Sequence, residues 1–184
     1  MLFSRTAVPF LHLAFAALIP DRTEAELLDR LEAASWVKRA ASFYRFSVPQ
    51  DDSFRASLLD AIIDHSDLRD RHRELEDIFG CGLGDDFRVE VHRYGEGDGI
   101  GAHTDFLTPE VRCVLSLNRG WDASQGGVWV LASDSALQTD TAYLPSLSNT
   151  GFIFATAANS FHALSVYNKT AAFGLTIRIP RVSS

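Results

Sequence analysis

The sequence predicts a mainly β protein with supporting helices (α+β), built as an antiparallel sandwich or barrel with N-terminal helices packed on one side. Apolar residues recur at helical spacing before about residue 80. From Phe87 onward the apolar period changes to two, which is typical of half-buried strands. The short strand-like runs that follow are separated by Gly, Asn, Asp and Pro, a spacing that favours antiparallel sandwiches and barrels over alternating βαβ units.

The first 86 residues are expected to supply a strand and supporting helices. Residues 8–20, VPFLHLAFAALIP, are apolar and predict an opening strand buried on both faces. A helix begins near Asp21, and residues 36–48 predict strands or an extended arm. A second helix runs from near Ser53 until the glycines at 80, 82 and 84 end it. The inner side of this second helix carries Leu58, Leu59, Ile62, Ile63, Leu68 and Leu75.

Residues 87–184 are expected to form the β core. Its predicted strands are residues 87–92, 112–117, 127–132, 150–154, 162–166 and 171–179. In the first strand Phe87, Val89 and Val91 are expected to face the core, so that Glu90 and His92 face outward. No repeat or linker interrupts residues 1–184, so we expect a single domain.

The composition and charge of the chain limit the kinds of molecule that it is expected to bind. The net charge of −7 argues against nucleic acid, because phosphate binding requires clustered Lys and Arg. The apolar run at residues 8–20 is too short to span a membrane and lacks a polar cleavage region. Cys81 and Cys113 have no metal-binding spacing and are expected to be buried thiols. We expect a cytoplasmic protein with a small-molecule or peptide substrate, and the sequence leaves its oligomeric state open.

One stretch, RYGEGDGIGAHTDF (residues 93–106), indicates a metal site. His103 and Asp105 are two residues apart, so on a strand they project to the same face. His162, on a later predicted strand, is the best third ligand. Two histidines and one carboxylate leave three positions open on a six-coordinate ion, which is the arrangement of non-haem Fe(II) oxygenases. The remaining histidines, His12, His65, His72 and His92, are read as ordinary solvated or capped side chains, and Asp98, Thr104 and Glu110 as surface groups.

Several ordered pieces between Phe87 and Arg181 resemble the double-stranded β-helix (jelly-roll or cupin-like) of the Fe(II)- and 2-oxoglutarate-dependent dioxygenases. The similarity is greatest to their prolyl-hydroxylase-like branch. These pieces are RYG…HTD, Arg112, SLNRGWDASQGG, the run from Pro145 to Phe154, and His162 before FGLTIRI. The resemblance implies a hydroxylase in which His103, Asp105 and His162 are the catalytic and metal residues. It also implies Fe(II), with 2-oxoglutarate and O2 as cosubstrates that are converted to succinate and CO2. An intact Asp105 favours hydroxylation over halogenation.

The chain departs from this family where the 5-carboxylate of 2-oxoglutarate is usually bound. An Arg or Lys nine or ten residues after the second histidine is replaced by Ala171 and Ala172, and a common tyrosine by Ser116. The leading replacement is Arg178, which shares a strand face with Ala172. Further cofactor-binding candidates are Arg112, Tyr94 and Arg93.

Two other interpretations stay open. A 2-oxoglutarate-independent iron oxidase, in which the substrate chelates the metal, would explain the missing base. A non-catalytic cupin-like domain that binds a metal or small ligand is the third.

Overall fold

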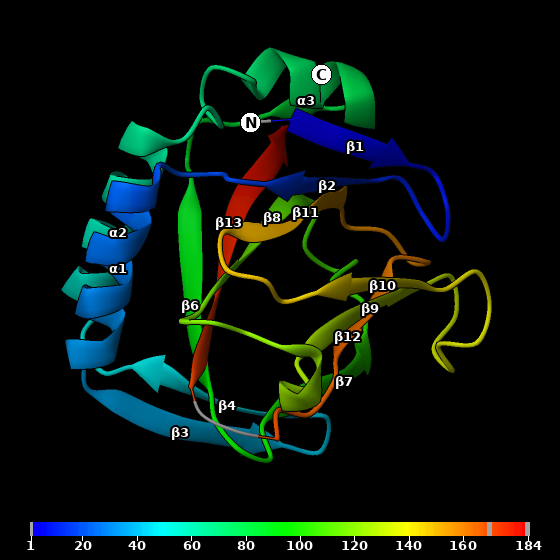
Figure 1. The fold of residues 1–184 in the computed structure, drawn as a ribbon. Helices are drawn as coiled ribbons and strands as arrows, with labels where there is room; N and C mark the ends of the chain where they lie inside the picture. Colours follow the sequence, from blue (N-terminus) through cyan, green and yellow to red (C-terminus); the bar gives the residue numbers. More distant parts are fainter. Residues whose placement is uncertain (1, 169–170, 183–184) are drawn as a thin grey trace.

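The computed structural model describes residues 2–168 and 171–182, in which a single curled antiparallel sheet carries helices on one side (Figure 1). The strands are β1 (Leu2–Thr6), β2 (His12–Ala16), β3 (Trp36–Ala41), β4 (Tyr44–Pro49), β5 (Gly82–Leu83), β6 (Arg88–Tyr94), β7 (Gly99–His103), β8 (Glu110–Leu117), β9 (Val128–Ala132), β10 (Ala142–Pro145), β11 (Thr150–Ala155), β12 (Phe161–Leu164) and β13 (Ala172–Val182). The helices are α1 (Asp21–Ala33), α2 (Asp52–His65), α3 (His72–Phe79) and the short 3-10 helix η1 (Ala123–Gln125).

The sheet follows the order β1-β2-β11-β8-β13-β6-β4-β7-β12-β9-β10, with β3 added to β4 and β5 to β13. The long strands β8, β13 and β6 form its centre, and β4 connects them to the half formed by β7, β12, β9 and β10 (Figure 1). The curled antiparallel sheet and the helices beside it confirm the predicted mainly β, jelly-roll-like class.

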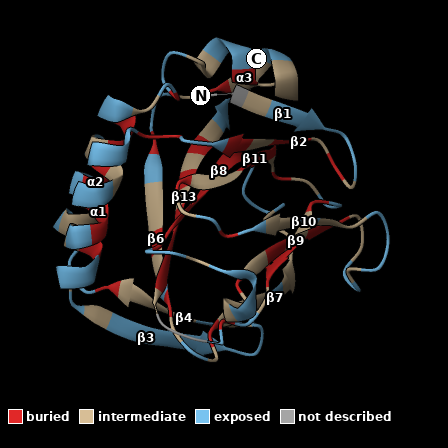
Figure 2. Cartoon of the chain, viewed as in Figure 1, coloured by how far each residue is buried: buried red, intermediate tan, exposed pale blue. Residues whose placement is uncertain are grey.

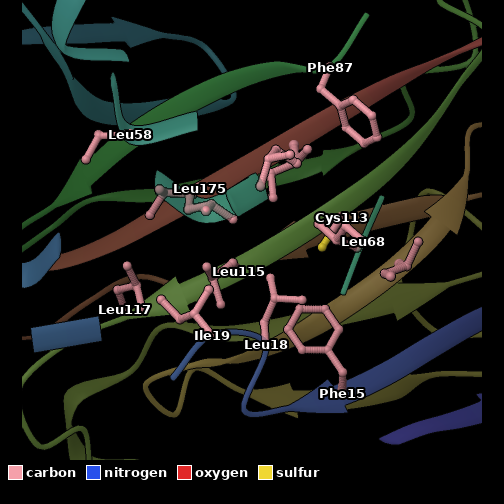
Figure 3. Close-up of a cluster of buried hydrophobic side chains, with 14 of the residues drawn as sticks. Phe15, Leu18, Ile19, Leu58, Leu68, Phe87, Cys113, Leu115, Leu117 and Leu175 are labelled. Carbon is pink, nitrogen blue, oxygen red and sulfur yellow. The ribbon is translucent and has the colours of Figure 1, made fainter. Parts of the chain in front are cut away.

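The two faces of β13 belong to two different apolar cores, because successive side chains of a strand point to opposite sides. Phe173, Leu175, Ile177 and Ile179 lie in the core under the helices, where Leu58 of α2 is also fully buried. Figure 3 shows part of this core, with Leu175 near Leu58 and with Cys113, Leu115 and Leu117 of β8. Ala172 faces the other way, into a second core inside the curled sheet.

The second core is largely aromatic. It contains Phe10, Tyr94, Val114, Trp129, Leu131, Phe152, Phe154, Leu164, Tyr167 and Ala172. Figure 2 shows that buried segments continue from the central strands into β9, while the outer surfaces of α1, α2 and β3 are exposed. The strands therefore separate a core that supports the fold from an interior that surrounds the candidate site.

Two N-terminal predictions are wrong in detail. Residues 8–20 form not one strand but the loop and second strand of the β1–β2 hairpin, since Leu2–Thr6 pairs with His12–Ala16. The expected long second helix is two helices, because Ser66 leaves the helical region (φ −109°, ψ 157°) and α3 begins only at His72. Leu68 and Leu75 are nevertheless buried, as their spacing predicted.

Three further observations bear on the sequence predictions. Cys81 and Cys113 are both free thiols, with Cys113 buried and Cys81 partly buried. Residues 36–48 form the β3–β4 hairpin, as expected. Within residues 2–168 and 171–182, none of the helices is long and apolar enough to cross a membrane.

Candidate metal centre and active site

The three predicted ligands come together at one end of the β7–β12 pair. His103, the last residue of β7, lies directly opposite His162 of β12 in the strand register. Asp105 lies in the turn after β7, where its carbonyl accepts a hydrogen bond from the Thr108 amide at 3.0 Å. The turn, not a shared strand face, therefore brings the carboxylate to the two imidazoles.

The ligand atoms are close enough to share one ion. His162 Nε2 lies 3.3 Å and His103 Nε2 3.9 Å from Asp105 Oδ2. One donor atom from each of the three residues falls within 4.8 Å of the others. A divalent ion at ligand distances of about 2.0–2.2 Å fits between atoms spaced in this way.

Backbone hydrogen bonds set the orientation of both imidazoles. His103 Nδ1 lies 2.9 Å from the Gly101 carbonyl oxygen, and His162 Nδ1 lies 3.0 Å from that of Ser160. A carbonyl only accepts, so each Nδ1 carries the proton and each Nε2 presents a lone pair. Such a bond behind the ring is the usual support of a metal-binding histidine.

This arrangement fits a metal cation. Two Nε2 lone pairs face the buried Asp105 Oδ2, which makes an ion pair with Arg112 Nη1 at 2.9 Å but no hydrogen bond of good geometry within the described residues. Three acceptor atoms that converge in this way repel one another, and a bound cation between them removes that repulsion.

The charge states also suit metal binding. Burial, together with the neighbouring His162, lowers the pKa of His103, so the imidazole is neutral at pH 7. Burial alone would raise the pKa of Asp105, but the interactions with His162 and the Arg112 guanidinium outweigh it and lower that pKa. The site thus presents the neutral His103 imidazole and the ionised Asp105 carboxylate, the forms in which these side chains bind metals.

A small cavity of about 50 Å³ adjoins the two histidine ligands, His103 and His162. Strands β6, β8 and β13 contribute most of its polar lining residues, and the other strands contribute mainly apolar side chains and the two histidine ligands. The lining residues are Glu90, His92, Ile100, His103, Arg112, Val114, Trp129, Phe154, His162 and Thr176.

Strand β6 faces the site with the residues that the sequence analysis assigned to solvent. Glu90 and His92 line the cavity, whereas Val91 is packed in the core under the helices. The His92 ring packs on Phe46 at 4.1 Å between centroids. Burial, with the nearby Arg112 charge, lowers the pKa of His92 to about 4. The outward assignment of His92 is wrong, because β6 is covered on both faces and an alternating pattern does not show which face carries the site.

Two acidic residues that were read as surface groups are buried. Glu110 is only 5% exposed and lies between two arginines, with Arg178 Nη2 at 2.6 Å and Arg112 Nε at 3.2 Å. Asp98 is 1% exposed; it pairs with Lys38 and accepts a hydrogen bond from the Gly95 amide at 2.9 Å. The sequence does indicate that Glu110 is buried, because Glu110 and Arg112 alternate at the start of an otherwise largely apolar strand.

Three of the four cosubstrate candidates, Arg112, Arg178 and Tyr94, have different positions relative to the cavity. Arg112 lines the cavity, with Nη1 2.9 Å from Asp105 Oδ2. Arg178 lies further along β13, where Glu110 and Glu90 hold it; its Nη1 is 2.7 Å from Glu90 Oε1. Tyr94 is fully buried and stacks on Tyr167 at 5.5 Å.

Comparison with known proteins supports the fold. No family model matches the sequence, and no curated protein matches it. The solved structures that share its architecture include the following three. A Pseudomonas putida prolyl-4-hydroxylase has a TM-score of 0.66 at 17% identity, over 94% of this chain and 93% of that one. A 2OG-Fe(II) oxygenase family oxidoreductase from Burkholderia pseudomallei has a TM-score of 0.70 at 15% identity, over 92% and 85%.

The third is a prolyl hydroxylase from Trichoplax adhaerens in complex with a peptide fragment of hypoxia inducible factor. It has a TM-score of 0.63 at 13% identity, over 90% of this chain and 82% of that one. The chain therefore has the fold of the prolyl hydroxylases and 2OG-Fe(II) oxygenases, and the predicted resemblance is confirmed at the level of fold.

Proposed function

We propose that this protein is a non-haem Fe(II)- and 2-oxoglutarate-dependent oxygenase. In the proposed reaction it hydroxylates an amino acid, a peptide or a small metabolite, and 2-oxoglutarate and O2 become succinate and CO2. The observation that carries the proposal is the set of three convergent acceptors, His103 Nε2, Asp105 Oδ2 and His162 Nε2, each within 4.8 Å of the others. They lie in a fold shared with 2OG-Fe(II) oxygenases.

The protein residues supply position and charge in this scheme. His103, Asp105 and His162 would hold the ion on one side and leave its other side open to ligands. When bound, Fe(II) supplies the redox chemistry with the 2-oxo acid and oxygen. Trp129 and Phe154 form an apolar wall beside His162 and limit the access of water.

The mouth of the site suits an organic substrate with apolar groups. Phe43, at the tip of the β3–β4 hairpin, packs on the His103 ring at 5.7 Å and is 47% exposed. Phe106 and Leu107, which follow Asp105, are 52% and 84% exposed. Exposed apolar side chains grouped beside a candidate active site are typical of a binding surface.

The proposal is tested without knowledge of the substrate. Fe(II) is added to the purified protein under anaerobic conditions, and 2-oxoglutarate is titrated while the visible spectrum is recorded. A saturable charge-transfer band in the wild type, lost in His103→Ala, is the expected result. Absence of the band while Fe(II) stays bound would refute the proposal.

One observation favours a second candidate, an iron oxidase that needs no 2-oxo acid. The positions of the usual base are Ala171 and Ala172, so the usual partner of the 5-carboxylate is missing. In that case a substrate with its own chelating groups would bind the metal and supply the electrons, and turnover would release no succinate.

A further inference from the structure

We propose that Arg112 binds the distal carboxylate of the 2-oxo acid and so takes the place of the missing base on the last strand. This inference rests on the proposed oxygenase function. It assigns the cosubstrate anchor to a different strand, β8, and to the immediate neighbourhood of the metal ligands.

The usual position is filled by uncharged groups. Ala172 faces the interior, where the rings of Tyr94 and Tyr167 stack. Gly127 makes room for this pair, because a Cβ there would lie 2.1 Å from the Tyr167 ring. A dianion placed against these rings would lose its hydration without gaining a cation.

The other arginines considered are either paired with carboxylates or on the far side of the sheet from the cavity. The Arg178 guanidinium donates to both Glu110 oxygens, at 2.6–3.0 Å, and to Glu90 at 2.7 Å. Arg93 lies on the opposite face of β6 from Glu90 and His92, and it is exposed. Among the described residues that line the cavity beside the metal ligands, Arg112 is the one cation.

Arg112 has unused capacity to bind a carboxylate. Its side chain is 11% exposed, and its Nε is buried without a hydrogen bond although Glu110 lies 3.2 Å away. A guanidinium has five N–H donors and binds carboxylates through two parallel bonds. Its long side chain allows the group to turn from Asp105 toward a ligand.

The size of the cavity and the charges around it indicate when the Arg112 guanidinium moves. The cavity measures about 50 Å³, well below the roughly 300–1,000 Å³ of small-molecule sites, so a dicarboxylate enters only if the guanidinium shifts. Around the cavity, Asp105, Glu110 and Glu90 face Arg112 and Arg178, which leaves one excess negative charge. A divalent ion reverses that sign, so the metal binds first and the anionic cosubstrate second.

The test compares two acids that differ only at the distal end. The two acids are 2-oxoglutarate and 2-oxopentanoate, which has a methyl group in place of the terminal carboxylate. Each is titrated into the anaerobic Fe(II) protein, and the charge-transfer band gives its affinity. Wild type is expected to prefer 2-oxoglutarate. Arg112→Gln is expected to weaken 2-oxoglutarate binding roughly 10- to 100-fold and to bind both acids equally. Arg22→Gln, a matched change at an exposed position of α1, keeps the wild-type preference.

The outcomes separate the two proposals. If no acid gives a band in the wild type, the oxygenase function and the role of Arg112 both fail. If the wild type gives a band but Arg112→Gln keeps the preference, or Arg178→Gln loses it instead, the function stands and the Arg112 assignment is refuted. Should Arg112→Gln not fold, Arg112→Gln with Glu110→Gln removes the two opposite charges together and answers the same question.

Discussion

Lowering the pH is expected to destabilise the folded protein, because His92 is held neutral in the folded state. The pKa of His92 is lowered from 6.5 to about 4 in the folded state, first by burial and then by Arg112. Between these two values the unfolded chain binds the extra proton and the folded chain does not, so stability falls as the pH falls. The contribution is complete above pH 6.5 and is lost on acidification to about pH 4. At 1.36 kcal/mol per pKa unit it amounts to about 3 kcal/mol.

The measurement is urea unfolding at pH 7.5 and at pH 4.5, in the presence of a chelator, for wild type and His92→Gln. The variant should lose less stability between the two pH values than wild type, by about 2–3 kcal/mol. His65→Gln, at an exposed position of α2, is the matched control and keeps the wild-type difference. An identical pH dependence in wild type and His92→Gln would show that His92 is protonated equally in the folded and unfolded states, and the reasoning would be refuted.

Three further changes test the site and the fold. His162→Ala should abolish Fe(II) binding in isothermal titration while far-UV circular dichroism is unchanged; tight binding by the variant would exclude His162 as a ligand. Gly151→Ala should unfold the protein or cost more than about 3 kcal/mol, because the new Cβ would lie 1.7 Å from a carbonyl oxygen of β8. Gly95→Ala, whose Cβ would meet its nearest atom at 3.8 Å, is the tolerated control, and equal melting temperatures for the two would contradict this packing. Glu110→Ala should cost about 3–5 kcal/mol, because it removes the buried carboxylate that lies between Arg112 and Arg178. Glu26→Ala, in an exposed pair, should cost less than about 0.5 kcal/mol; similar denaturation midpoints would contradict that difference.

Much of the fold could be predicted from local patterns. The period of two from Phe87 onward and the helical spacing after Asp21 gave the correct elements, because each pattern reflects one buried face. Asparagine is a common turn residue, and Asn118 lies at a turn where its Oδ1 accepts a hydrogen bond from the Trp121 amide at 2.9 Å. Strand β7, with its glycines, and the short β10 were not predicted, because neither carries an apolar alternation.

The candidate site was predictable where chemistry is local and unpredictable where it depends on packing. The spacing of His103 and Asp105 marked a ligand pair, although a turn and not a strand positions the carboxylate. The burial of His92 required knowledge of which strand face closes the interior, and Asp98 lies in the turn between β6 and β7, where no alternation marks it. When a sheet is covered on both sides, an alternating sequence does not show which set of side chains faces the site.

The alternation along β13 has a consequence for how this protein can change. Phe173, Leu175 and Ile177 support the helices, while Ala172, Gly174 and Thr176 between them face the interior of the sheet. Substitutions at every second position can therefore alter ligand preference with little effect on the core under the helices. An insertion or deletion of one residue would exchange the two sets at once. We therefore expect β13 to tolerate point substitutions on its interior face but not changes in its length.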